Sequence, residues 1–142
     1  MQDRPTSIEL LEAAADFVDR ELVPVIEGAK QFQARVVANV MRIVAREIQL
    51  EDPYVRREVK ALAKLLGHEA PHLHGLDDLR KASAEFAGEL SNRIRAGDAD
   101  TGAWRAEVMA NVRQSVEDKL RIANPRYIEA DLAARGGPAK QS

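Results

Sequence analysis

The segment from Lys30 to Leu50 constrains the fold of this chain more than any other stretch. It contains no Gly or Pro and is rich in helix-forming residues, so it predicts a helix of about six turns. At about 100° per residue, its apolar side chains gather in one wide arc. The arc contains Phe32, Val36, Val37, Val40, Met41, Ile43, Val44 and Ile48. We therefore predict a central helix at about 30–50 that the rest of the chain encloses on most sides.

The opposite side of this helix carries a polar ridge made of Arg35, Asn39, Arg42 and Arg46. The four residues fall within about 60° of one another on the helical wheel. Guanidinium groups bind carboxylates and phosphates through paired hydrogen bonds, so this Arg ridge is a candidate surface for a phosphorylated or carboxylated partner, and a protein interface is the functional interpretation that we favour. The alternative is an ordinary solvated face whose charges are neutralised by acidic residues of neighbouring helices.

Glu47 is the exception in the apolar arc, because a carboxylate there needs a partner or a raised pKa. It could act as a general base, but no second carboxylate, nucleophile or phosphate loop accompanies it. The interpretation that we favour is a structural ion pair with Arg126. That arginine belongs to a corner, Asn124-Pro125-Arg126-Tyr127, that is expected either to pack as a C-terminal latch or to form an interaction site.

Composition supports a helical fold and excludes several classes of site. Hydrophobic residues make up 45% of the chain but aromatic residues only 4%, so Ala, Leu, Val and Ile must build the core. Such cores are typical of helices packed on helices. Cys is absent, which excludes disulfides, thiolate zinc sites and cysteine nucleophiles. The formal charge of -2 does not favour nucleic acid as a partner.

The pattern of caps and breaks predicts an all-α fold, an antiparallel bundle of four to five helices around the central helix. Thr6 and Glu9 have the spacing of a capping box, and Asp52-Pro53 is a typical helix start. Thr101 or Asp100 is expected to cap the last long helix. The helices are expected at about 7–22, 30–50, 52–66, 77–96 and 101–123, with Phe86, Trp104, Val112 and Val116 among the core residues.

We predict one helical-bundle domain over residues 1–128, followed by a partly disordered C-terminal extension at 129–142. A short disordered lead-in is expected over residues 1–5. The N-terminus does not resemble a signal peptide, and no apolar run approaches the roughly 20 residues that span a bilayer. The expected location is the cytoplasm.

His68, His72 and His74 lie close together, with Glu69, and a histidine trio is a weak candidate for a metal site. They would suit a metal site only if the first two lay on one helix, and Gly67 and Pro71 indicate a loop instead. The chain also lacks a Walker loop, a dinucleotide fingerprint, an HExxH motif and a serine nucleophile elbow. We therefore predict no catalytic residues, no cofactor and no metal.

Four short motifs resemble those of a family of small helical bacterial proteins without an assigned catalytic role. They are Arg4–Thr6, Phe32–Asn39, Arg46–Glu47 and Asn124–Tyr127, and the likeness covers about residues 4–128. Members of that family are typically encoded beside a kinase of the aminoglycoside-phosphotransferase type and an acyl-CoA dehydrogenase. The resemblance implies an accessory subunit, similar to the one that supports the hydroxyacyl-CoA kinase of levulinate catabolism. In such a subunit the Arg ridge would dock the kinase or approach the CoA phosphates.

Two other classes of function, and one mode of assembly, remain open from the sequence. A stand-alone helical protein could bind a ligand or an acyl-CoA, and as an enzyme it would need Glu47 or the histidines in a cleft. A small nucleic-acid-binding module would use the Arg ridge and would lose affinity steeply with salt. A homodimer through the ridge or through the exposed part of the central helix is compatible with each of these functions.

Overall fold

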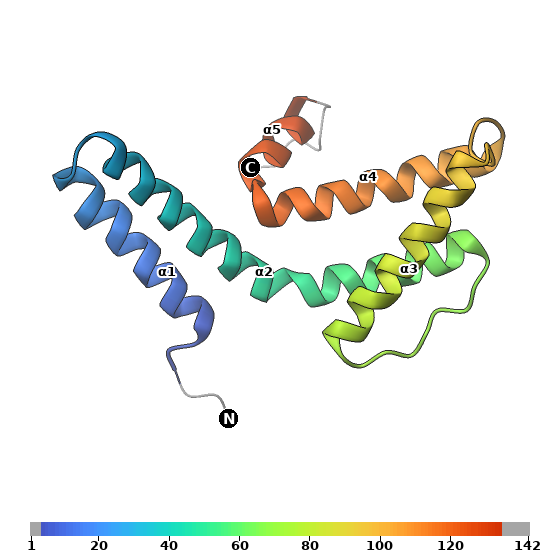
Figure 1. Cartoon of the computed structure of the whole chain (residues 1–142), viewed down its shortest axis with the longest axis horizontal. Coiled ribbons are helices and arrows are strands. Elements are labelled where there is room, and N and C mark those ends of the chain that lie inside the picture. Colours follow the sequence, from blue (N-terminus) through green and yellow to red (C-terminus); the bar gives the residue numbers. More distant parts are fainter. Residues whose placement is uncertain (1–3, 135–142) are drawn as a thin grey trace, which may run out of the picture. The chain divides into compact units, whose positions relative to one another are not determined.

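The computed structural model describes residues 4–134, and this part of the chain is all-α and contains no strand (Figure 1). The predicted fold class is therefore confirmed. The helices are α1 (Ser7–Phe17), a π-helical segment η1 (Val18–Leu22), a 3-10 segment η2 (Val23–Val25), α2 (Gly28–Leu66), α3 (Leu76–Arg95), α4 (Ala103–Ala123) and α5 (Pro125–Ala134).

Contacts divide the chain into two compact units, Met1–Glu51 and Asp52–Ser142. The helix α2 contributes its first part to one unit and its second part to the other. The expected single domain over 1–128 stays a prediction.

The first helix begins where its capping box predicts. The Thr6 backbone N–H donates to Glu9 Oε2 at 2.7 Å, and the Glu9 N–H donates to Thr6 Oγ1 at 3.3 Å. These two bonds satisfy donors that have no partner within the helix.

The segment between α1 and α2 turns the chain. The helical path tightens through η2, where Pro24 lies, before Gly28 adopts a positive φ of 63°. Because glycine tolerates that conformation, the chain can turn there into α2.

The helix α2 is 39 residues long and continues through Pro53. The predicted break between two helices at Asp52-Pro53 is therefore wrong. Proline lacks only one backbone donor, and the side chain of Asp52 does not cap a new helix but accepts hydrogen bonds from Arg56 at 2.9 and 3.0 Å. These bonds lower the pKa of Asp52. Arg56 also donates to the carbonyl oxygen of Leu73, which holds the following loop against α2.

The end of α2 follows the sequence closely. Gly67 has a φ of 79°, its N–H donates to the Lys64 carbonyl, and the His68 N–H donates to the Ala63 carbonyl at 2.8 Å. This pair of bonds is a Schellman motif, which requires a residue that adopts the left-handed region. Glycine at this position therefore stops the helix as predicted.

In the first unit, α1 lies beside the first part of α2 (Figure 1). The most deeply buried side chains of these two helices are small: Ala15 on α1, and Ala38 and Ala45 on α2. Asp16, the neighbour of Ala15, forms an ion pair with Arg42, which lies between the two α2 alanines in sequence. The two helices therefore meet at an alanine seam, where small side chains allow a close approach.

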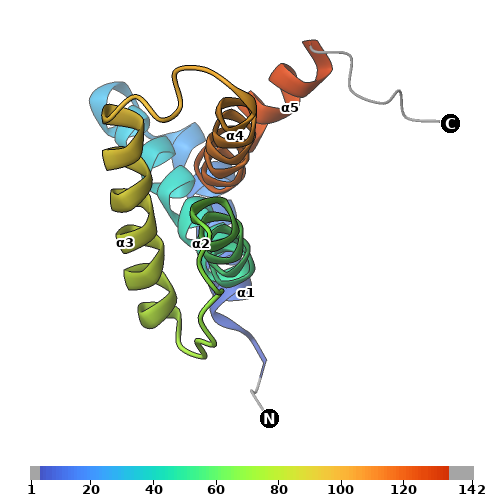
Figure 2. The same ribbon diagram turned by 90° about the vertical axis from the view of Figure 1, so that its right-hand side faces the viewer.

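In the second unit, α3 and α4 pack against the second part of α2 (Figure 2). The core brings together one residue or more from each helix and one from the turn between α3 and α4. Phe86, Trp104 and Leu65 are partly buried and pack around it. The buried members are Leu62, Leu66, Leu90, Ala99 and Val108. The predicted core positions of Phe86 and Trp104 are confirmed.

A polar network ties the same three helices together. Glu58 of α2 accepts hydrogen bonds from Ser83 of α3 at 2.8 Å and from Ser115 of α4. Next to it, the buried Asp118 pairs with Arg57 and accepts a bond from Gln114 at 2.9 Å. A carboxylate that leaves water must gain such donors. This network could not be predicted from the sequence, because nothing in the spacing of these residues singles out Glu58.

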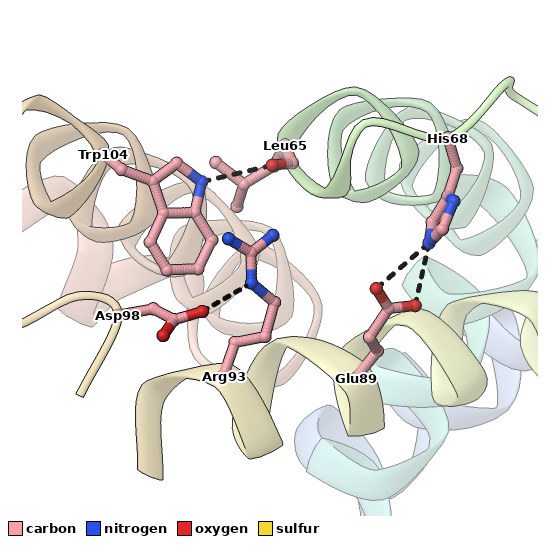
Figure 3. A network of polar contacts seen from close by, with 6 residues as sticks. All are labelled: Leu65, His68, Glu89, Arg93, Asp98 and Trp104. Atoms are coloured by element: carbon pink, nitrogen blue, oxygen red, sulfur yellow. Dashed lines mark hydrogen bonds and ion pairs between the residues drawn. The ribbon is translucent and has the colours of Figure 1, made fainter. Parts of the chain in front are cut away.

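The indole of Trp104 links α4 to the end of α2 by donating to the Leu65 carbonyl at 3.2 Å (Figure 3). The guanidinium of Arg93 lies over the same ring, 4.1 Å from its centroid, and donates to Asp98 at 2.9 Å. Cation–π contact and ion pair together orient Arg93 at the α3–α4 turn. The ring is therefore a structural element of this corner.

The C-terminal helix begins at Pro125 after Asn124, as the sequence predicts for the end of α4. The Tyr127 N–H donates to both the backbone oxygen of Asn124 at 3.1 Å and its side-chain oxygen at 3.3 Å. Asn124 thus starts α5 as well as ending α4.

The predicted cap at the N-terminus of α4, Thr101 or Asp100, is wrong. The N-cap residue is Gly102, and no side chain forms a capping hydrogen bond there. Residues 1–3 of the expected lead-in and residues 135–142 of the expected C-terminal extension lie outside the described residues.

Candidate functional site

The apolar arc of the central helix is largely exposed, which corrects the expectation that the chain encloses it. Phe32 is 69% exposed, Val40 50% and Ile48 52%, and Val36 and Val44 between them are exposed as well. These five residues recur at every fourth position, so they form one continuous row along α2. We call this row the valine ridge. It extends for about 24 Å at 1.5 Å per residue.

The reason for the exposure lies on the other side of α2. The helix α1 covers the side that carries Ala38, Ala45 and Arg42, which is about 120° or more from the centre of the valine ridge on the helical wheel. Small side chains and a satisfied guanidinium let α1 approach there. The periodicity identified the residues that share a face correctly, but the prediction of which face would be buried was wrong.

Arg42 of the predicted Arg ridge is committed to the fold. Its guanidinium donates to Asp19 and, at 3.0 Å, to Asp16 of the preceding segment. Hydrogen bonds to Asp19, then to Asp16, raise the pKa of Arg42. Acidic residues of the same chain thus neutralise this member of the ridge, which corrects its assignment as part of a free working surface.

The other ridge residues have different surroundings. Arg46 lines a small cleft between α1 and α2 together with Glu12 and Asp16. Arg35 and Asn39 are exposed near the start of α2. Their role as contacts for a partner or for a phosphate stays a prediction.

Glu47 is exposed and lies in α2 beside the valine ridge, next to Ile48 and one turn from Val44. Its predicted partner Arg126 is also exposed and belongs to the other unit. The ion pair between them stays a prediction, as does the role of Asn124 and Tyr127 as an interaction site. Within the described part of the first unit, the structure records no basic side chain against the Glu47 carboxylate.

The three histidines lie in the loop between α2 and α3, as Gly67 and Pro71 predict. His68 stacks on Phe86 with ring centroids 5.6 Å apart, and its Nε2 lies 2.9 and 3.1 Å from the Glu89 carboxylate oxygens (Figure 3). His72 and His74 are exposed. Over residues 4–134 no group of three or more potential ligands is arranged to hold a metal ion.

A second apolar surface lies on α4 and α5. Val112 and Val116, predicted as core residues, are exposed instead, as are Met109 and Tyr127. With Ile128 they line a groove of about 310 Å³ between these two helices. The prediction that Val112 and Val116 are core residues was wrong. The side of α4 that packs against α2 and α3 is the one that carries Val108.

A larger cleft of about 470 Å³ lies between α2 and α4 in the second unit. Ala61, Leu65 and Ala110 contribute apolar side chains to its lining, and the Arg57–Asp118 pair and Lys64 contribute charged ones. Its volume is within the range of small-molecule sites. Its polar side chains were not recognised in the sequence because they come from helices that are distant along the chain.

A family model described as a domain of unknown function, DUF6285, matches residues 24–127. The chain belongs to the DUF6285 family. The match to DUF6285 includes the whole valine ridge and the core of the second unit, whereas Asp16 and Asp19, which neutralise Arg42, precede it. No curated protein and no solved structure matches the chain.

In this DUF6285 protein, none of the helices in the described range is both long and apolar enough to cross a membrane. The exposed apolar row belongs to an amphipathic stretch of α2 whose other faces carry charged residues.

Proposed function

We propose that this chain is an accessory subunit without catalytic residues of its own, which binds a phosphotransferase-like kinase that acts on hydroxyacyl-CoA intermediates. The observation that carries the proposal is the valine ridge. Single exposed hydrophobic residues are normal on a protein surface, but a contiguous row of this length typically marks an interaction site. The likeness of the four short motifs to an accessory-subunit family supplies the identity of the partner, and we place the complex in the cytoplasm.

The ridge is suited to receive a helix. Its residues repeat every four positions on a straight element, so they form a ridge that fits a groove on a second helix. Val and Ile side chains have few rotamers to lose on binding. Arg35 and Asn39, at the edge of this face, are placed to make polar contacts around an apolar centre, as is usual at interfaces.

Val40→Asp is the variant that tests the proposal, because Val40 lies at the middle of the ridge. We expect it to weaken binding to the proposed partner kinase by at least about 30-fold, since a central interface residue typically contributes 2 kcal/mol or more. Stability should change little, because the side chain is half exposed in the free chain. Co-purification, followed by a kinase assay with and without this protein, measures both effects.

The matched control is Gln49→Asp, which adds the same charge to an exposed position of α2 away from the ridge. We expect this variant to bind like the unchanged protein. Equal binding by the Val40→Asp chain would remove the ridge from the interface, and kinase activity that does not depend on this protein would overturn the accessory role.

The cleft between α2 and α4 favours a second candidate function, binding of an acyl-CoA or a similar ligand by the chain alone. Its apolar lining residues suit an acyl chain, and Lys64 adds a cation to the lining. For this function we expect the isolated protein to bind an acyl-CoA saturably. Ala61→Phe should abolish this binding, because the added ring would occupy the cleft. Isothermal titration with an acyl-CoA distinguishes the two functions, because an accessory subunit that acts only through the ridge gives no heat of binding.

A further inference from the structure

A second row of residues borders the valine ridge on one side. Arg35, Asn39, Ile43 and Glu47 each precede one member of the ridge by one residue, so they form a parallel row with the same four-residue spacing. We call it the border row. Arg35 and Glu47 are exposed at its two ends, about 18 Å apart at 1.5 Å per residue. Among the residues that the structure describes in the first unit, neither is engaged in an ion pair. The border row therefore ends in opposite charges that have no counterpart in this unit.

This arrangement of charges is self-complementary. Two copies that pack ridge to ridge with antiparallel α2 helices are related by a two-fold axis that lies in the interface and crosses both helices. Such an axis brings the same side of the two helices together and reverses the order of their residues. The two border rows then lie side by side in opposite order. With the axis at the level of Met41, midway between the two charges, each Arg35 faces Glu47 of the second copy.

The apolar side chains match in the same register. Val40 lies one residue from the axis, so it meets Val40 of the second copy. On the side away from the border row, Val37 comes within one residue of the level of Val44 of the second copy. Phe32 and Leu50 are both nine residues from Met41, so they also come to one level. The register that pairs the charges thus covers Phe32, Val37 and Val40, which are 69%, 46% and 50% exposed in the single chain.

Other arrangements of two copies leave charges unfavourably placed. Glu47 lies about 20° from Val40 on the helical wheel, near the middle of the exposed face. A parallel pair brings equal residue numbers to one level, so it sets the two Glu47 carboxylates against each other. An antiparallel pair shifted by two turns separates Arg35 from Glu47 and covers the carboxylate with apolar side chains, which is costly without a cation.

We propose that the chain on its own forms an antiparallel homodimer through the valine ridge, held in register by two symmetric ion pairs between Arg35 and Glu47. The dimer does not depend on the proposed function. Because one ridge holds one occupant at a time, the second copy covers the ridge until the proposed kinase replaces it. Self-association thus competes with binding of the kinase.

Sedimentation equilibrium of the complete chain, without any other protein, tests the dimer. We expect twice the 15.7 kDa of one chain, and a monomer for Val40→Asp at the same concentration. Arg35→Glu and Glu47→Arg each place like charges at two symmetric positions, so each should weaken dimerisation by at least about 30-fold. Lys60→Glu makes the same reversal at an exposed position of α2 in the second unit and should leave the dimer unchanged.

Mixing the two charge variants gives the decisive measurement. The Arg35→Glu chain carries Glu at both positions and the Glu47→Arg chain carries Arg at both. A pair made of one chain of each kind therefore regains both ion pairs. We expect two monomeric variants that form a 1:1 dimer when mixed, a result that misfolding of either variant cannot give.

Each contrary outcome overturns a stated part. An unchanged chain that stays monomeric up to its solubility limit overturns the dimer and leaves the proposed function in place. A dimer that survives Val40→Asp lies on another surface, and charge variants that stay monomeric on mixing exclude the Arg35–Glu47 register, so both results overturn the inference. A kinase complex that retains the intact dimer would overturn the use of the ridge by the kinase and leave the dimer in place.

Discussion

Leu62→Ala is expected to lower the free energy of unfolding by about 2–5 kcal/mol, the usual range for a buried leucine replaced by alanine. Leu62 is 2% exposed and is one of the α2 residues in the core that α2 shares with α3 and α4. The substitution removes apolar contacts and leaves a cavity among Leu66, Leu90 and Val108. Urea denaturation measures the loss, and fluorescence of Trp104, the single tryptophan, reports on this unit because its ring packs on the same cluster.

The control for this prediction is Leu10→Ala, the same substitution at a residue of α1 that is 56% exposed. Its effect should stay within about 0.5 kcal/mol, as for most surface changes. Equal destabilisation by the two variants would contradict the placement of the core among α2, α3 and α4.

Ala15→Leu is expected to destabilise the first unit by about 1–3 kcal/mol, because the alanine seam has no room for a larger side chain. Ala15 is fully buried, and its neighbour Asp16 is held by Arg42 of α2. The added atoms must push α1 away from α2, which also lengthens the Asp16–Arg42 contact. Hydrogen exchange of the α1 amides should become faster, and thermal unfolding followed by circular dichroism should begin at a lower temperature.

Ala13→Leu makes the same change at an exposed position of α1 and should leave exchange and melting nearly unchanged. If Ala15→Leu were as stable as Ala13→Leu, α1 could not pack on α2 through the alanine seam. Packing of α1 on the valine ridge instead would overturn the proposal that the ridge binds a partner.

Much of the local structure was predictable because it depends on neighbouring residues. Thr6 and Glu9 form the capping box that their spacing predicts, and Gly67 ends α2 in the left-handed conformation. Asn124-Pro125 ends α4 for a similar reason, since proline disfavours a helical conformation of the residue before it. The break expected at Pro53 did not occur, because a proline removes only one helical hydrogen bond and α2 has strong helix formers on both sides of it, such as Leu50, Glu51 and Arg56.

The candidate site was predictable only in part. Periodicity placed Val36, Val40 and Val44 on one face and Arg42 on another, and the structure agrees with both groupings. The assignment of those faces to core and surface was reversed, since Arg42 packs against α1 and the valines are exposed. The hydrogen bonds from Ser83 and Ser115 to Glu58 could not be foreseen, because their partners come together only through the packing of three helices.

The sequence by itself therefore determined that the chain is helical, where most helices begin and end, and which side chains share each face. These properties follow from backbone preferences, caps and a period of 3.6 residues, all of which act over a few positions. Only the tertiary structure decided which face of α2 is covered. Burial requires a neighbour of matching shape and charge, and α1 offers Ala15 and two carboxylates, which match the side of Ala38, Ala45 and Arg42 and leave the valine ridge exposed.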